Sequence, residues 1–106
     1  MRYKEGVPST GLHWRMRKAL QVAKFIWESL GKELVVTATT DGEHCEWSWH
    51  YYGCAVDLRS RDFSRAEAQA AVRNLRNQLP DGYQVIVHAT HVHIEYDHEL
   101  VDGGGS

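Results

Sequence analysis

The chain has 106 residues, 42% of them hydrophobic and 25% charged, which is the composition of a globular domain with one modest core. Its net charge of -2, with acidic and basic residues interspersed, gives no basic stripe for nucleic-acid phosphates. No segment approaches the roughly 20 apolar residues that span a bilayer, and no apolar run of a secretory signal follows the N-terminus. We therefore expect one monomeric domain over residues 1–98, cytoplasmic as synthesised, with no nucleic-acid or membrane partner.

An irregular lead-in and a helix are expected first. Met1–Pro8 shows no periodicity, and Ser9 or Thr10 could then cap a helix that ends at Gly31. Apolar residues recur along this helix at spacings of three and four, which is typical of a face that packs on a core. They are Leu12, Met16, Leu20, Ala23, Ile26, Trp27 and Leu30.

Two strands with a polar loop between them should follow. Leu34–Thr39 is rich in β-branched residues, and Asp41–Trp49 is polar. Cys54–Arg59 alternates between apolar and other residues, as a strand with one buried face does. In that alternation Asp57 points away from the apolar side of its strand.

The last third predicts a helix and two further strands. Ser64 and Glu67 have the spacing of a capping box, and Pro80 stops the helix that follows. Tyr83–Val87 and Val92–Tyr96 read as strands with a short connection. The fold class expected from this order is α+β, with two main helices and a small, largely antiparallel sheet.

Two segments bring together side chains that can bind a metal. His50 and Asp57 lie seven residues apart around Gly53, where the backbone can turn tightly enough for both to converge. Near the C-terminus, alternation places several polar residues on one strand face. They are His91, His93, Glu95 and Asp97.

Two imidazoles and one carboxylate are a usual ligand set for a catalytic zinc with one position open to water. Such a zinc ion lowers the pKa of its water to about 7 and polarises a carbonyl, which permits amide hydrolysis. Taken singly, each histidine could instead be a hydrogen-bonded structural residue or part of a solvated face. Their joint occurrence with Asp57 favours a hydrolase.

These motifs resemble those of a known zinc peptidase family. Its signature S-x-H-x-x-G-x-A-x-D is reproduced at five fixed positions, Ser48, His50, Gly53, Ala55 and Asp57. His91-Val92-His93 is similar to the closing H-x-H of the same family. The family contains D-Ala-D-Ala carboxypeptidases, dipeptidases and L-alanyl-D-glutamate endolysins, and it shares its fold with the hedgehog signalling domain. The resemblance runs from about Leu12 to Asp97.

The resemblance implies a role for each matching residue. His50, Asp57 and His93 correspond to the zinc ligands, and His91 to a histidine that supports a ligand or faces substrate. Ser48 would shape the substrate side of the site, and His44 in the preceding loop could contact substrate or only solvent. The neighbouring aromatic residues could line the rim or pack internally. They are Trp47, Trp49, Tyr51 and Tyr52.

One position departs from the family pattern. The family usually carries a carboxylate three residues before the last ligand, as the general base, and here that position is Thr90. An imidazole can accept the proton near neutral pH instead, which makes His88 and His91 the candidate catalytic bases. Glu95 is less favoured, because it follows the ligand along the strand.

The expected function is therefore a zinc-dependent peptidase for short peptides of bacterial peptidoglycan, of carboxypeptidase or endopeptidase type. A phage or a bacterial export system would release it to the cell wall. The alternative is a zinc-binding module of the same fold without catalysis. An engineered descendant is a third possibility, since residues 99–106 end in a flexible Gly-Gly-Gly-Ser linker of the kind that cloning adds. Pairing of Cys45 with Cys54 stays open.

Overall fold

The computed structural model describes residues 1–7, 12, 14–39 and 54–96, and it has the expected α+β architecture. In chain order its elements are β1 (Arg2–Tyr3), α1 (Trp14–Ser29), β2 (Val35–Thr39), β3 (Cys54–Arg59), α3 (Arg65–Gln78), β4 (Tyr83–Val87) and β5 (His91–Tyr96). Among the described residues, no helix is long and apolar enough to cross a membrane. The caps expected at Ser9 or Thr10 and the tail of residues 99–106 lie outside the described residues.

The five strands form one mixed sheet in the order β1-β2-β3-β5-β4. All neighbouring strands are antiparallel except β1 and β2, which are parallel. The sheet is therefore mixed, because the expected antiparallel sheet lacked this parallel pair. The expectation of an irregular lead-in is also corrected, because Arg2–Tyr3 forms β1. The Arg2 N–H donates to the Leu34 carbonyl at 2.8 Å and the Lys4 N–H to the Val36 carbonyl at 2.9 Å. A strand of two residues is too short to show periodicity in the sequence, so β1 is recognised only by its pairing with β2.

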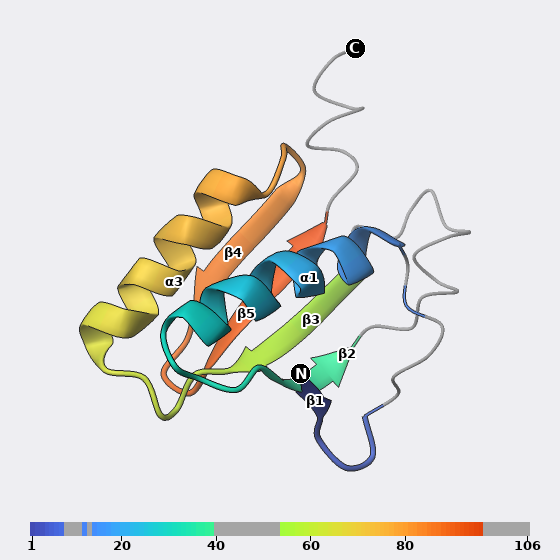
Figure 1. The fold of residues 1–106 in the computed structure, drawn as a ribbon. Coiled ribbons are helices and arrows are strands. Elements are labelled where there is room, and N and C mark those ends of the chain that lie inside the picture. Colours follow the sequence, from blue (N-terminus) through green and yellow to red (C-terminus); the bar gives the residue numbers. More distant parts are fainter. Residues whose placement is uncertain (8–11, 13, 40–53, 97–106) are drawn as a thin grey trace.

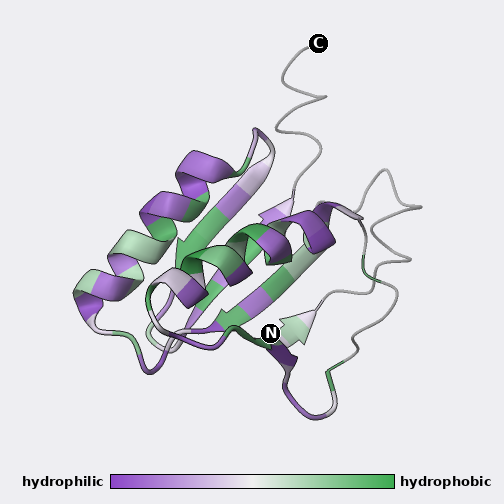
Figure 2. Cartoon of the chain, viewed as in Figure 1, coloured by the Kyte–Doolittle hydropathy of each residue, from purple (hydrophilic) through white to green (hydrophobic). Residues whose placement is uncertain are grey.

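Both helices cover the same face of the sheet (Figure 1). Helix α1 packs on β3 and β5, and α3 packs on β4 and against α1. Hydrophilic and hydrophobic residues alternate along both helices and along β3, so each element has one face toward the core and one toward solvent (Figure 2). We call the opposite side of the sheet the open face. Its central residues are Ala55, Asp57 and Arg59 of β3 and His91, His93 and Glu95 of β5.

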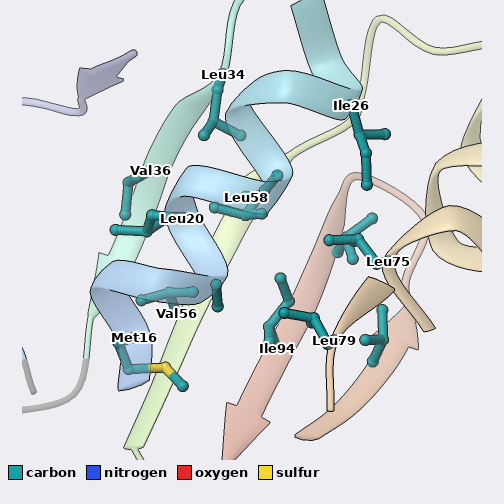
Figure 3. Close-up of a cluster of buried hydrophobic side chains, with 14 of the residues drawn as sticks. Met16, Leu20, Ile26, Leu34, Val36, Val56, Leu58, Leu75, Leu79 and Ile94 are labelled. Atoms are coloured by element: carbon teal, nitrogen blue, oxygen red, sulfur yellow. The ribbon is translucent and has the colours of Figure 1, made fainter. Parts of the chain in front are cut away.

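The core lies between the helices and the sheet, where apolar side chains of both layers point toward one another (Figure 3). The apolar spacing in α1 correctly predicted the part of this core that the helix supplies. Trp27 is fully buried, its ring lies 5.2 Å from the Phe63 ring, and its Nε1–H donates to the Arg59 carbonyl at 3.1 Å. Trp27 therefore ties α1 directly to the end of β3.

The two helix boundaries follow from local hydrogen bonds. At the end of α1, Gly31 has φ 73°, its N–H donates to the Glu28 carbonyl, and the Lys32 N–H donates to the Trp27 carbonyl. This is the Schellman pattern, in which the residue after the helix end adopts a left-handed backbone conformation. Glycine adopts that conformation at the lowest cost because it has no Cβ atom. At the start of α3, the expected capping box is present. The Ser64 Oγ accepts from the Glu67 N–H at 3.1 Å, and the Ser64 N–H donates to the Glu67 carboxylate at 2.8 Å.

Removing this cap should destabilise the domain measurably. Ser64→Ala leaves the Glu67 N–H without its acceptor, and we expect a loss of about 1 kcal/mol in the free energy of unfolding. Urea denaturation followed by circular dichroism measures the change. Ser29→Ala is the matched control, because the exposed Ser29 bonds only backward within α1, and it should change stability by less than about 0.5 kcal/mol. Equal losses in both variants would contradict the role given to the cap.

Candidate metal centre

The register of β3 and β5 brings the candidate site residues together. Asp57 lies directly opposite His93, Arg59 opposite His91, and Ala55 opposite Glu95. In both strands the alternate residues are buried in the core, so these positions lie on the open face and are partly buried. The face predicted for Asp57, His91 and His93 is therefore confirmed.

Asp57 and His93 are in direct contact across the two strands. The Nδ1 atom of His93 lies 2.7 Å from the Oδ1 atom of Asp57. An ionised carboxylate can only accept a hydrogen bond, so with Asp57 ionised the donor in this contact is the Nδ1–H of His93. The two side chains are 27% and 28% exposed. The pair is thus held by the two strands and stays partly exposed on the open face.

Two further histidines surround this pair. The His91 Nε2 atom lies 4.0 Å from the second oxygen of Asp57, Oδ2, so the carboxylate lies between two imidazoles. His88 stands at the turn between β4 and β5, where its N–H donates to the His91 carbonyl at 2.9 Å. Its ring stacks on that of His91 with centroids 4.5 Å apart, and it meets the His93 ring edge-on at 6.4 Å. The β4–β5 hairpin thus gathers three imidazoles beside one carboxylate.

A second carboxylate approaches the other side of His93. The Glu95 Oε1 atom lies 3.9 Å from the His93 Nε2 atom, and the Glu95 side chain is 30% exposed. Strand alternation had placed Glu95 on this face, but only as a remote candidate for the base. Its nearness to Nε2 is a relation that sequence reasoning missed, although the two-residue spacing from His93 was the available signal.

Thr90, at the position where the peptidases that the motifs resemble carry their acid, lies in the same hairpin. Thr90 is exposed, and its Oγ1 atom lies 3.4 Å from the His91 Nδ1 atom. Its backbone carbonyl accepts from the Ser60 N–H at 3.0 Å, which holds the turn against the end of β3. A side chain at this position therefore faces His91, the neighbour of the Asp57–His93 pair.

The Asp57 and His93 donor atoms suit a zinc ion in type and in placement. Zinc takes imidazole nitrogen and carboxylate oxygen at about 2.0–2.2 Å, so two such atoms on a tetrahedral ion stand roughly 3.3 Å apart. The observed 2.7 Å between His93 Nδ1 and Asp57 Oδ1 would have to widen by only ~0.6 Å. Among residues 1–7, 12, 14–39 and 54–96, no group of three such side chains is arranged to hold a metal. The third expected ligand, His50, lies outside these residues.

Several other predicted residues also lie outside the part of the chain that the structure describes. These are His44 and Ser48, expected at the substrate side, together with Cys45 and the aromatic residues Trp47, Trp49, Tyr51 and Tyr52. Their roles stay predictions. The described residues supply two of the three expected ligands and both candidate bases.

Comparison with known proteins identifies no relative of the chain. No family model matches the chain. No curated protein and no solved structure matches it either. The functional argument therefore depends on the motif residues and on the geometry of the open face.

Proposed function

We propose that this chain is a zinc-dependent peptidase that hydrolyses short peptides of bacterial peptidoglycan, with His50, Asp57 and His93 as zinc ligands. The observation that carries the proposal is the contact of Asp57 and His93 across β3 and β5. These two residues are the ends of separate motifs, 36 positions apart, and the sheet brings their donor atoms to one point. The spacing of His50 and Asp57 in the first motif adds the third ligand.

The surroundings of the pair favour a metal site over an isolated structural hydrogen bond. A single His–Asp pair could simply join two strands, but here two more imidazoles and a second carboxylate lie beside it. These groups occupy the open face and contribute nothing to the apolar core between the sheet and the helices. The cluster thus offers imidazole nitrogen and carboxylate oxygen atoms, which are the donor types that zinc takes.

Each residue then has a defined task. A zinc ion in such a site activates a water molecule and polarises the scissile carbonyl. Asp57 and His93 would hold the ion from two paired strands, whose backbone fixes the positions of both residues. His91 is the better placed base, because its Nε2 atom lies 4.0 Å from Asp57 Oδ2, whereas the His88 ring lies against the rings of His91 and His93. His91 would accept the proton of the attacking water and return it to the leaving amine.

A zinc-binding module without catalysis is the second candidate, and one observation favours it. The position of the usual acid holds Thr90, whose hydroxyl faces His91. Among the described residues, the acidic side chains beside His93 are Asp57 and Glu95. Asp57 is assigned to the metal, and Glu95 approaches the opposite nitrogen of the ring. Activity therefore depends on an imidazole as the base.

Zinc analysis combined with a cleavage assay tests the proposal. The chain, stripped with a chelator and reloaded with zinc sulfate, is incubated with muropeptides, and the products are identified by mass spectrometry. We expect one zinc ion per chain by elemental analysis, cleavage that the chelator abolishes, and recovery when zinc is restored. Stoichiometric zinc without cleavage would favour the module instead.

Replacing the two candidate bases should separate binding from turnover. His91→Ala should lower kcat by about 100-fold or more, the contribution of a well-placed general base, while the bound zinc stays near one per chain. His88→Ala should reduce kcat by much less than about 100-fold, because it is His91 whose Nε2 atom lies 4.0 Å from Asp57. Steady-state kinetics on one muropeptide and elemental analysis of both variants measure this. Loss of zinc in the His91 variant would make His91 a ligand and contradict its assignment as the base.

A further inference from the structure

His93 has a carboxylate at each ring nitrogen, and the two are not equivalent. Asp57 Oδ1 lies 2.7 Å from Nδ1, within hydrogen-bond range, whereas Glu95 Oε1 lies 3.9 Å from Nε2. A neutral imidazole has one N–H donor and one acceptor nitrogen. In this structure Nδ1 is therefore the ring nitrogen that forms the hydrogen bond, and Nε2 faces the Glu95 carboxylate from beyond hydrogen-bond distance.

Coordination of a metal by this pair requires the other tautomer. The nitrogen that faces Asp57 is Nδ1, so an ion shared by Asp57 and His93 binds to Nδ1 and leaves the proton on Nε2. The number of protons on the ring is unchanged, since Nδ1 gives one to solvent and Nε2 takes one from it. The protonated Nε2 then needs an acceptor, because a partly buried donor without a partner is costly.

We propose that Glu95 is a positioning residue, whose carboxylate accepts the Nε2–H of His93 and thereby holds the ring in the tautomer that binds metal through Nδ1. Glu95 follows His93 by two residues on the same strand face and opposite Gln84 of β4, so the sheet fixes the relative positions of the two residues. Histidine ligands commonly donate their second N–H to such a partner. The inference rests on the proposed zinc site, but it does not depend on peptidase activity.

Zinc affinity in matched variants tests the role of Glu95. Competition with a chromophoric chelator should show zinc binding weakened about 10- to 100-fold in Glu95→Ala, the usual cost of losing such a partner. Glu95→Gln should recover part of the affinity, because its amide oxygen can still accept the hydrogen bond. Glu28→Ala removes the same charge from an exposed position of α1, which packs on the other side of the sheet. This variant should bind zinc as wild type does.

A second readout follows the proton itself. In the metal-free protein with ¹⁵N-labelled histidine, long-range ¹H–¹⁵N spectra should place the His93 proton on Nδ1. One equivalent of zinc sulfate should move it to Nε2. The inference would be overturned if Glu95→Ala bound zinc with the same affinity as Glu28→Ala. It would also be overturned if zinc were attached to His93 through Nε2. Zinc bound through Nδ1 in a wild-type protein that cleaves no muropeptide would remove the peptidase proposal and leave the role of Glu95 standing. No zinc affinity in wild type would overturn both.

Discussion

Asp57→Ala and His93→Ala should each remove the stabilisation by zinc that the proposed site predicts for the folded protein. A ligand that binds only the folded state raises the free energy of unfolding by about 2.7 kcal/mol at a concentration 100 times its Kd. Each variant lacks one of the two donor atoms that meet on the open face at 2.7 Å. Loss of a residue that only hydrogen-bonds a ligand, such as Glu95, costs up to about 100-fold in zinc affinity. We expect the loss of a ligand itself to cost more than that. Urea denaturation with and without zinc sulfate measures the effect.

Two control variants accompany this experiment. Asp62→Ala removes an exposed carboxylate beyond the end of β3, and His88→Ala removes an exposed imidazole of the β4–β5 hairpin. Both should respond to zinc as wild type does. If Asp57→Ala retained the full response, the ligand assignment would be wrong. If wild type itself showed no response, the Asp57–His93 contact would be a structural hydrogen bond between strands.

Trp27→Ala should be among the most destabilising substitutions in the described core. The side chain is fully buried, packs against Phe63 and donates a hydrogen bond to the Arg59 carbonyl. Truncation leaves a cavity of indole size and an acceptor without its donor, at a cost of about 3–5 kcal/mol in the free energy of unfolding. Urea denaturation followed by far-ultraviolet circular dichroism avoids any dependence on the fluorescence of the deleted residue.

A neighbouring aromatic residue on the same helix is the matched control. Phe25 is 71% exposed, and Phe25→Ala should change stability by less than about 0.5 kcal/mol. Trp27→Phe retains much of the ring but loses the hydrogen bond, and we expect a loss of intermediate size, so folded protein remains measurable if Trp27→Ala does not fold. Equal effects of Trp27→Ala and Phe25→Ala would contradict the packing of α1 on the sheet.

Features set by neighbouring residues were predictable from the sequence. The Ser64–Glu67 capping box, the stop at Gly31 and the apolar stripe of α1 each depend on spacings of a few residues within one element. Alternation likewise assigned Asp57 and His93 to the polar sides of their strands. These predictions were correct because helix and strand geometry alone determines which residues share a face.

Features that depend on which strands pair were not predictable. Strand β1 is defined only by its hydrogen bonds to β2, and two residues carry no pattern of their own. The stacking of His88 on His91 depends on the geometry of the β4–β5 turn. The 3.9 Å approach of Glu95 to the Nε2 atom of His93 depends on the orientation of the ring, and the contact of Nδ1 with Asp57 on another strand fixes that orientation.

The Asp57–His93 pair separates what can be predicted from the sequence from what depends on strand pairing. The sequence determined the kinds of side chain and the face of each strand that carries them. The position of β3 beside β5, with Asp57 opposite His93 and not opposite His91, follows from the tertiary fold. The physical reason is register: a shift of one residue would turn every core side chain of the strand to the open face. A shift of two residues would keep the faces, and the alignment that forms pairs buried Val56 with Ile94 and Leu58 with Val92, where α1 packs on both strands.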